Sequence, residues 1–328
     1  MKVLVALDAG NSKTDAAVVR TDGTVLATVR GDGFRPTVDG PDAALAGVVA
    51  TIRAAVAAAG APPAALLAAY LANADFPAEV ERYRDGLSAL ALADRTVVGN
   101  DTFALLRSGA RRLAGVAAIC GAGINCLGIA EDGTVFRFPA LGKLSGDWGG
   151  GSGMAAEAMF AAARGEDGRG PATALAAAIA GHFRTRSAVA LAEELHFGRV
   201  ESGRLHEIVP LIFDVASAGD ATARAIVARQ AEELGLMAGV ALRRLALTER
   251  SVDVVLGGGV LAAGHPLLLD DVQARIEAMA PLAAIRIPDV SPLAGAILLG
   301  LDELGAPAEA EERIRATYRE WSARLVRA

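Results

Sequence analysis

The same order of predicted elements occurs twice along the chain, and this repetition limits the possible folds more than any other feature. Each half begins with a β-strand, a glycine-bearing turn, a second strand, an Asp-Gly turn and a third strand. These strands are expected at 2–8, 15–20 and 24–30, and again at 115–120, 124–130 and 134–138. Asp-Gly between two short apolar runs is a strong hairpin signal. We therefore expect a duplicated unit in which each copy opens with a three-stranded antiparallel meander.

Helices and further strands follow the meander in each half. In the first half we expect helices at 42–60, 77–92 and 102–113 and strands at 65–72 and 95–99. In the second half we expect helices at 152–164, 171–182, 187–196, 220–248, 264–280 and 292–303 and strands at 252–256 and 284–287. Strands that alternate with helices indicate an α/β fold. The predicted domains are 1–113 and 114–307, with a closing helix at 308–328 that packs back on the first domain.

Length and charge exclude several classes of protein. A chain of 328 residues suggests two domains, at roughly 100–200 residues each. The net charge of −6 argues against a nucleic-acid partner, which would need a basic stripe. Asp8 comes too early for a signal peptide, and we find no uncharged apolar run of about 18 residues that would predict a membrane span. We expect a soluble, cytoplasmic protein.

The first segment whose residues suit ligand binding is Asp8-Ala9-Gly10-Asn11-Ser12-Lys13-Thr14-Asp15, between two predicted strands. A tight turn rich in glycine and hydroxyl residues lets backbone N–H groups reach phosphate oxygens. The nucleotide-binding residues expected here are Gly10, Asn11, Ser12, Lys13 and Thr14. Asp8, at the strand end, is expected to hold Mg²⁺ through water. An ordinary hairpin is the alternative.

A second turn, Cys120-Gly121-Ala122-Gly123-Ile124-Asn125-Cys126, occupies the equivalent place in the second half. Two such turns that face each other would hold a triphosphate from both sides. A third segment, Leu256-Gly257-Gly258-Gly259-Val260, runs from a strand into a helix, and glycine lets a flat ring or a phosphate approach the backbone closely. The nucleotide-binding residues expected in these segments are Gly121, Ala122, Gly123, Asn125, Gly257, Gly258 and Gly259.

Two acidic residues stand in informative places. Asp101 follows a predicted strand and begins a helix. It is either a helix N-cap or a base that accepts a proton from a substrate hydroxyl. Asp147 and Trp148 lie in the glycine-rich run 144–153. Flexible linkers are rich in Gly and Ser, but Asp-Trp at the centre favours a mobile, ligand-contacting loop.

Taken in order, these motifs resemble those of the BadF/BadG/BcrA/BcrD ATPase family, which includes N-acetylglucosamine kinase. The run from Asp8 to Thr14 resembles its first phosphate motif, 120–126 its second, 256–260 its adenosine motif and 292–296 its closing helix. The resemblance covers nearly the whole chain. It implies the actin/hexokinase/Hsp70 superfold, with two duplicated RNase H-like domains and ATP with Mg²⁺ in the cleft between them.

The resemblance also implies roles for single residues. Asp101 falls where the kinases place their catalytic base and contacts the substrate, and Asp147, next to Gly146, falls where they place a second, sugar-contacting acid. Asn73 lies near the stretch that lines the sugar cleft. Two features depart from the pattern. Residues 33–37 lack the Asn that binds an acetamido sugar, and Ala122 stands where Thr is common.

The implied activity is ATP-dependent phosphorylation of a sugar hydroxyl, with the 6-hydroxyl of N-acetylglucosamine or a related hexosamine as the expected acceptor. The alternative is an ATPase activator of a 2-hydroxyacyl-CoA dehydratase or benzoyl-CoA reductase type system, which carries an iron–sulfur cluster at a dimer interface. A cluster needs about four thiolates, so a dimer would have to supply Cys120 and Cys126 from both copies. Because Cys126 lies inside the second turn, a position also seen in the kinases, we favour the kinase.

A sugar sensor is a third alternative, but the phosphate motif begins at residue 8 and leaves no room for a preceding DNA-binding domain. The oligomeric state stays open, with a homodimer as one alternative.

Overall fold

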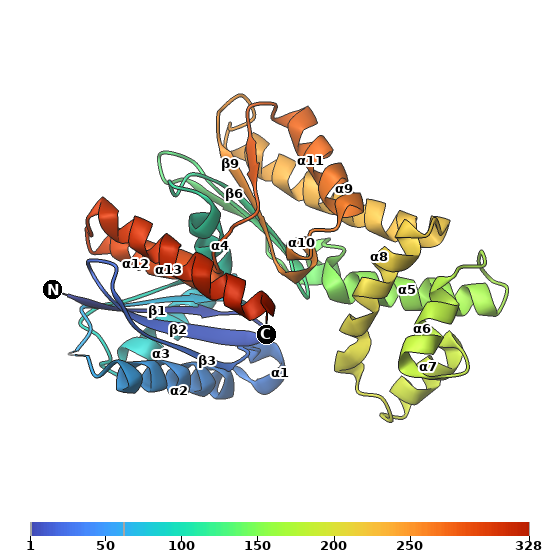
Figure 1. Ribbon diagram of the computed structural model, residues 1–328, viewed down its shortest axis with the longest axis horizontal. Coiled ribbons are helices and arrows are strands. Elements are labelled where there is room, and N and C mark those ends of the chain that lie inside the picture. Colours follow the sequence, from blue (N-terminus) through green and yellow to red (C-terminus); the bar gives the residue numbers. More distant parts are fainter. Residues whose placement is uncertain (1, 62, 328) are drawn as a thin grey trace.

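Two five-stranded sheets with the same strand order form the centre of the protein (Figure 1). The computed structural model describes residues 2–61 and 63–327, and for 321–327 the backbone alone. The first sheet has the order β3 (Val25–Asp32), β2 (Lys13–Arg20), β1 (Val3–Ala9), β4 (Leu66–Leu71) and β5 (Thr96–Asn100). The second has the order β8 (Val135–Arg137), β7 (Ile124–Ile129), β6 (Gly115–Cys120), β9 (Asp253–Gly257) and β10 (Ala284–Arg286).

The pairing within the two sheets is also the same. In chain order, the first three strands of each sheet pair antiparallel. The fourth strand pairs parallel with the first, and the fifth pairs parallel with the fourth. Antiparallel neighbours need only a short hairpin, whereas parallel strands need a crossover, which a helix supplies here. The predicted duplicated α/β fold is therefore confirmed.

Strand β1 is buried on both faces because helices cover the first sheet from both sides. Val5 and Leu7 face a core shared with α2 (Pro41–Ala59) and α3 (Pro77–Ser88). Leu4 and Ala6 face a core shared with α12 (Pro292–Glu303) and α13 (Ala308–Arg327). Successive side chains of a strand point to opposite faces, and this alternation explains why a continuous apolar run suits β1.

Helix α2 has the length and the apolar composition of a membrane span. In this structure it lies along the first sheet, with Val48, Ile52 and Ala55 buried in the core beneath it (Figure 1). Its apolar face is therefore explained by packing on the sheet.

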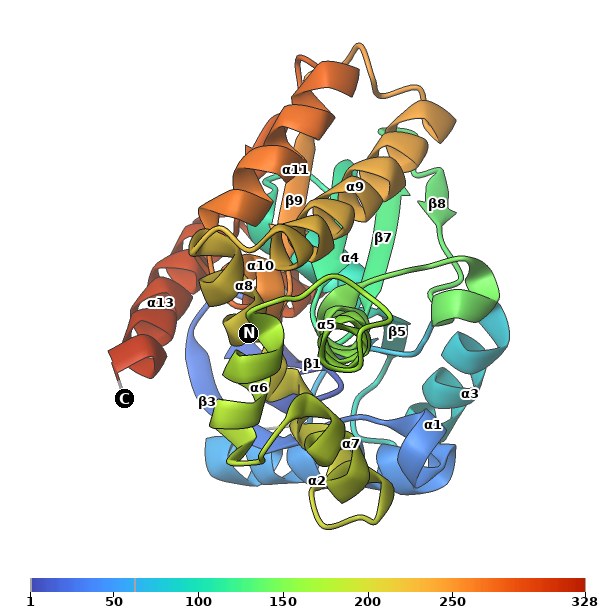
Figure 2. The same cartoon turned by 90° about the vertical axis from the view of Figure 1, so that its right-hand side faces the viewer.

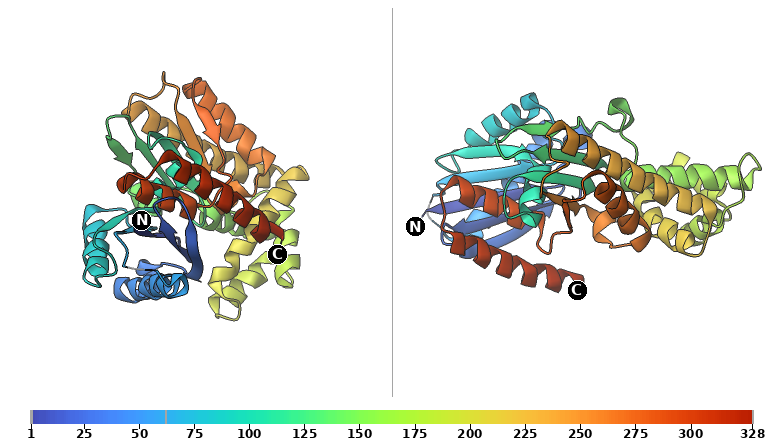
Figure 3. Two further views of the ribbon diagram at one scale, coloured as in Figure 1. Left: turned by 60° about the vertical axis from the view of Figure 1, so that its left-hand side comes forward. Right: turned by 90° about the horizontal axis from the view of Figure 1, so that it is seen from above.

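The C-terminal helices return to the first sheet although they follow the second in sequence. Helix α12 crosses α4 (Asp101–Gly109) so closely that a Cβ on Gly295 would lie 1.8 Å from the carbonyl oxygen of Ala104. Helix α13 buries Ala310, Ile314 and Tyr318 in the core of this sheet. The last elements of the chain thus form one layer of its first half (Figure 3).

The second sheet carries α9 (Ala221–Arg244), α10 (Gly259–Ala262) and α11 (Pro266–Met279). A group of helices extends from it to the right in Figure 1 and lies in front in Figure 2; it comprises α5 (Gly150–Glu166), α6 (Leu175–Phe183), α7 (Ala188–His196) and α8 (Ile208–Ser217). Sequence analysis missed α8, as well as the short α1 (Pro36–Asp39). The 3₁₀ turn η2 (Ser202–Glu207) runs directly into α8, which has no side-chain N-cap and contains Pro210 in its first turn. The usual start signals are therefore missing.

Candidate active site

A cavity of about 370 Å³ lies where the carboxyl ends of β1, β4, β6 and β9 meet, between the two sheets. In α/β proteins, ligands bind at such carboxyl ends. Most of the predicted site residues line it: Asp8, Gly10, Asn11, Ser12, Lys13, Asn73, Asp101, Gly121, Ala122, Gly123, Asn125, Gly258 and Gly259. The fold therefore brings the two glycine turns, the strand-to-helix glycines and Asp101 to one place.

Hydrogen bonds from neighbouring segments hold the first turn in place. The N–H of Phe34 donates to the carbonyl of Gly10 at 2.9 Å, and the side-chain amide of Asn73 donates to Asn11 Oδ1 at 2.9 Å. Within the part of the chain that the structure describes, the backbone N–H groups of Asn11 and Ser12 have no acceptor. Unpaired amides on a turn favour an anion.

The second turn is held in a similar way, by the start of α5. The N–H groups of Gly151 and Ser152 donate to the carbonyls of Gly121 and Ala122, at 2.7 and 2.9 Å. These bonds direct the carbonyl oxygens of the turn toward the helix. Among the described residues, the N–H groups of Ala122 and Gly123 have no acceptor. Each turn thus has two N–H groups without an acceptor among the described residues, and both turns line the same cavity.

Glycines around the second turn permit the close packing that holds it. A Cβ on Gly150, which has φ of +67°, would lie 2.5 Å from the backbone of Gly123. A Cβ on Gly258, at φ of +89°, would lie 2.5 Å from the carbonyl of Cys120. The fully buried Gln230 accepts the N–H of Gly150 at 2.8 Å and fixes the start of α5. The glycine-rich run 144–153 therefore serves packing as well as any ligand contact.

Asp101 is the first residue of α4, and its neighbour supplies the helix cap. Asn100 Oδ1 accepts the N–H of Thr102 at 3.1 Å, which is the bond of an N-cap residue. The cap interpretation of Asp101 is therefore wrong, and its carboxyl is available to the cavity. Burial, followed by the charge of Asp75, raises the pKa of Asp101 to about 7.

Asp8 supplies a carboxyl at the end of β1. Burial raises its pKa to about 8, and the charges of Asp101 and Asp15 add to this effect. Like charges gathered in a partly buried site favour either protonation or a compensating cation. Mg²⁺ is often held by one or two carboxylates together with water and phosphate oxygens. Asp8 therefore fits the role of a magnesium-binding residue.

Four predicted site residues lie outside the described lining of the cavity: Thr14, Gly146, Asp147 and Gly257. The Thr14 hydroxyl is buried and has no partner among the described residues. Gly146 and Asp147 follow η1 (Gly142–Ser145), and the Asp147 N–H donates to the carbonyl of Gly142 at 3.0 Å. A Cβ on Gly257 would lie 2.4 Å from Leu105, so this glycine permits α4 to pack against β9. The ligand contacts predicted for these residues stay predictions.

Sequence analysis missed Asp75, which lines the cavity beside Asp101. Burial raises the pKa of Asp75 to about 6, against the opposing charge of Arg137. No glycine turn or strand end marks Asp75 in the sequence, and Arg137 comes from the distant β8. Asp75 and Arg137 are neighbours only because the two sheets face each other in the folded protein.

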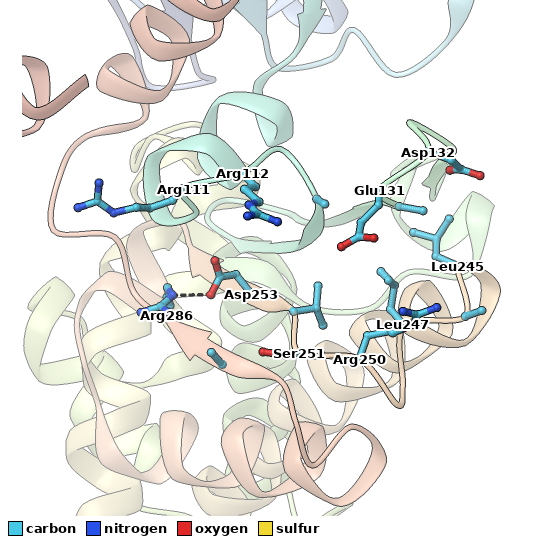
Figure 4. A pocket seen from close by; sticks show the side chains of 15 residues that line it. Arg111, Arg112, Glu131, Asp132, Leu245, Leu247, Arg250, Ser251, Asp253 and Arg286 are labelled. Carbon is cyan, nitrogen blue, oxygen red and sulfur yellow. Dashed lines mark hydrogen bonds and ion pairs between the residues drawn. The ribbon is translucent and has the colours of Figure 1, made fainter. Parts of the chain in front are cut away.

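A second and larger hollow, of about 560 Å³, lies away from these residues. It is lined by charged side chains that include Arg112, Glu131 and Arg250, and by an ion pair between Arg286 and Asp253 at 2.5 Å (Figure 4). Asp253 begins β9, so this hollow is at the end of the sheet opposite the glycine turns. None of the predicted site residues lines it.

Both cysteines lie inside the second half, in the core. Cys120 and Cys126 are fully buried, and burial raises the pKa of each thiol to about 12. A metal cluster needs exposed thiolates that two copies can share. This placement weighs against the activator alternative.

Two sheets of this topology, with paired glycine turns facing one cavity, define the actin-like ATPase fold. The chain matches the BadF/BadG/BcrA/BcrD ATPase family across residues 5–300, and it belongs to that family.

Known relatives and solved structures agree with this assignment. The chain is 25% identical over 190 residues to the N-acetylmuramic acid/N-acetylglucosamine kinase of Clostridium acetobutylicum, which covers 58% of this chain and 62% of that one. It is 27% identical over 209 residues to the N-acetyl-D-glucosamine kinase of Dictyostelium discoideum, which covers 62% of this chain and 65% of that one. The matched stretch is thus less than two thirds of either relative.

Solved structures share the fold over most of the chain. A Chromobacterium violaceum protein, provisionally named an N-acetylglucosamine kinase, has a TM-score of 0.72 at 21% identity, covering 91% of this chain and 99% of that one. A ROK family glucokinase from Streptomyces griseus, solved with glucose and AMPPNP, has a TM-score of 0.56 at 15% identity, covering 92% of this chain and 98% of that one.

Proposed function

We propose that the chain is an ATP-dependent kinase that phosphorylates a sugar hydroxyl, and that its acceptor is the 6-hydroxyl of N-acetylglucosamine or a related hexosamine. One observation carries the proposal. Two turns, one from each sheet, line a single cavity together with Asp101, and each turn has two N–H groups without an acceptor among the described residues. Phosphoryl transfer depends mainly on positioning and on stabilising charge, which such amides supply.

The phosphates of ATP would lie between the two turns. The amides of Asn11 and Ser12 would donate to them from one side and those of Ala122 and Gly123 from the other. Lys13, with a half-exposed side chain, would add a positive charge. Asp8 would hold Mg²⁺, which when bound neutralises phosphate charge.

Asp101 would accept the proton of the attacking hydroxyl. A general base works best when its pKa is near the operating pH, and the pKa of Asp101 is raised to about 7. Leu105 and Ile119 line the same cavity with apolar surface. Such surface would help to exclude water, which would otherwise compete with the sugar as acceptor.

The assignment of an amino sugar rests on the relatives, which are named as kinases of N-acetylated sugars. Asn73 and Asn125 line the cavity and would offer amide hydrogen bonds to such a substrate, in place of the Asn that 33–37 lacks. Gly146 and Asp147 would approach the sugar only after movement of their loop. A homodimer stays a prediction. We place the reaction in the cytoplasm, where ATP is available.

An ADP-release assay tests the proposal. It would use hexoses, glucosamine, N-acetylglucosamine and N-acetylmuramic acid as acceptors. We expect turnover with an amino sugar, and a loss of at least about 100-fold in Asp101→Asn, while Mg-AMPPNP still binds by calorimetry. Asp94→Asn, an exposed acid before β5, is the matched control and should keep its activity. The proposal fails if no sugar is phosphorylated, and the base assignment fails if Asp101→Asn turns over normally.

A further inference from the structure

Asp75 lies at the junction of the two sheets, in the loop between β4 and α3. Its side chain is 10% exposed. From its own sheet, the side-chain amide of Asn100 donates to Asp75 Oδ1 at 3.0 Å. This places a carboxylate against the residue that caps α4.

Two further donors reach Asp75 from the opposite sheet. Asn125 Nδ2, from β7, and Arg137 Nη2, from β8, both approach Asp75 Oδ1 at 3.4 Å. Arg137 also donates to the carbonyl of Ala74 at 3.0 Å. The carboxylate of Asp75 therefore contacts residues of both sheets.

The contacts continue from Asp75 to α4. Asn100, which donates to Asp75, accepts the N–H of Thr102 through its other side-chain atom at 3.1 Å. The guanidinium of Arg137 also lies 5.9 Å from the ring centre of Phe103. Both routes end in the first turn of α4, which begins with Asp101.

We propose that Asp75 is a positioning residue that transmits the arrangement of the two sheets to Asp101. The inference rests on the proposed function in taking Asp101 as the base. When the sheets close on their ligands, movement of β7 and β8 would pull on Asp75 and, through Asn100, set the start of α4. The charge of Asp75, which also raises the pKa of Asp101, is consistent with this closeness.

The three donors around Asp75 favour an ionised carboxylate at this position. Asn100, Asn125 and Arg137 all present N–H donors. All three reach the same oxygen, Oδ1, so a carboxamide of the same shape can keep its oxygen toward them but accepts only weaker hydrogen bonds than an ionised carboxyl does. It also removes the charge that faces Arg137. Asp75→Asn is therefore a sharp test, because it keeps the volume and removes the negative charge that strengthens these bonds.

The experiment compares Asp75→Asn with Asp85→Asn, an exposed acid on α3. In the free protein, hydrogen–deuterium exchange of the first turn of α4 should be about tenfold faster in Asp75→Asn and unchanged in Asp85→Asn, given the usual strength of a charged hydrogen bond. In the sugar-kinase assay, kcat should fall at least about tenfold while the Kd for Mg-AMPPNP stays within about twofold.

Arg137→Gln provides a second, independent variant at the edge of the second sheet. It should speed exchange at the same turn of α4, and the double variant should lose less kcat than the two single losses multiplied together. Unchanged exchange at α4 in Asp75→Asn overturns the proposal, as does strictly multiplicative loss in the double variant. Should Asp75→Asn fail to fold, exchange in Arg137→Gln decides alone. Exchange needs no sugar, so a wild-type protein without kinase activity would refute the proposed function and leave this test intact.

Discussion

Three carboxyl groups share the cavity, and each holds its proton more tightly than a solvated aspartate does. The pKa is raised to about 6 at Asp75, to about 7 at Asp101 and to about 8 at Asp8. Burial is the largest cause at all three, and neighbouring acids add to it at Asp101 and Asp8. Burial removes water that would stabilise the charged form. In the proposed function, these carboxyl groups would bind Mg²⁺ and accept the hydroxyl proton.

The pH dependence of turnover follows from the raised pKa of Asp101. The base must be ionised to accept a proton, so kcat/KM should rise with pH and level off above about 7. The measurement is kcat/KM for the sugar from pH 5.5 to 8.5, with nucleotide saturating. In Asp94→Asn the profile should be unchanged, because this exposed acid lies outside the described lining of the cavity. A rate that is flat across this range would contradict the role given to Asp101.

Adding a single carbon atom, the Cβ, at Gly150 tests whether the second turn binds the nucleotide. A Cβ there would be strained by φ of +67° and would lie 2.5 Å from Gly123. Gly150→Ala should displace the turn and weaken Mg-AMPPNP binding about tenfold or more, since such strain costs about 1–3 kcal/mol. Gly153→Ala, in the same helix, meets nothing within 4 Å and is the control. Equal nucleotide affinity in the two variants would show that the turn does not bind phosphate.

At the scale of elements, α4 is anchored at both ends. Its start is capped by Asn100, and its last carbonyls are covered by Arg315 of α13. Arg315 is 5% exposed and donates to the carbonyls of Ser108, at 2.7 Å, and Ala110, at 3.0 Å. Carbonyls at a helix end lack partners within the helix and favour a positive charge. The C-terminal helix therefore stabilises the element that carries Asp101.

Replacing Arg315 should destabilise the whole protein. Arg315→Gln removes the donors to the carbonyls of Ser108 and Ala110, whereas Glu311 keeps its second partner Arg107 at 2.7 Å. We expect a loss of about 2–3 kcal/mol in the free energy of unfolding, because buried acceptors that lose their donor cost about 1–3 kcal/mol each. Arg319→Gln breaks an exposed pair with Asp289 and should cost less than about 1 kcal/mol. Urea unfolding followed by circular dichroism measures both, and similar losses in the two variants would refute the anchoring role.

Elements defined by local sequence could be predicted, and contacts between distant elements could not. The two meanders were predicted because alternation and Asp-Gly turns are local signals, and Gly10 and Gly121 to Gly123 lie where those turns imply. Asp75 could not be predicted as a site residue, because Asn125 and Arg137 come close to it only when the two sheets face each other in the folded protein. Helix α9 was predicted at 220–248 and ends at Arg244. No glycine follows that helix to mark its end, since Ala246 adopts the positive φ itself.

At the scale of the whole molecule, the buried carboxyl groups of the cavity lower the stability of the folded state when they are ionised. Acids whose pKa is raised on folding bind more protons in the folded state than in the unfolded state. Between the unfolded pKa of 3.8 and the folded values of about 7 and 8 for Asp101 and Asp8, the free energy of unfolding must therefore fall as the pH rises. Glu207 and Glu311, whose pKa values are lowered to about 2, act in the opposite sense, but only near and below their unfolded pKa of 4.5.

The metal-free protein should accordingly be more stable at pH 5.5 than at pH 8. Thermal unfolding midpoints measured across this range should decrease with pH, and Asp8→Asn should flatten the decrease because it removes the group with the highest folded pKa of the three. Added Mg²⁺ should raise the midpoint more at pH 8, where Asp8 is ionised and can bind it, than at pH 5.5, where a proton competes. A wild-type midpoint that rises with pH, or a magnesium effect that is equal at both ends of the range, would mean that Asp8 neither keeps its proton nor exchanges it for the metal.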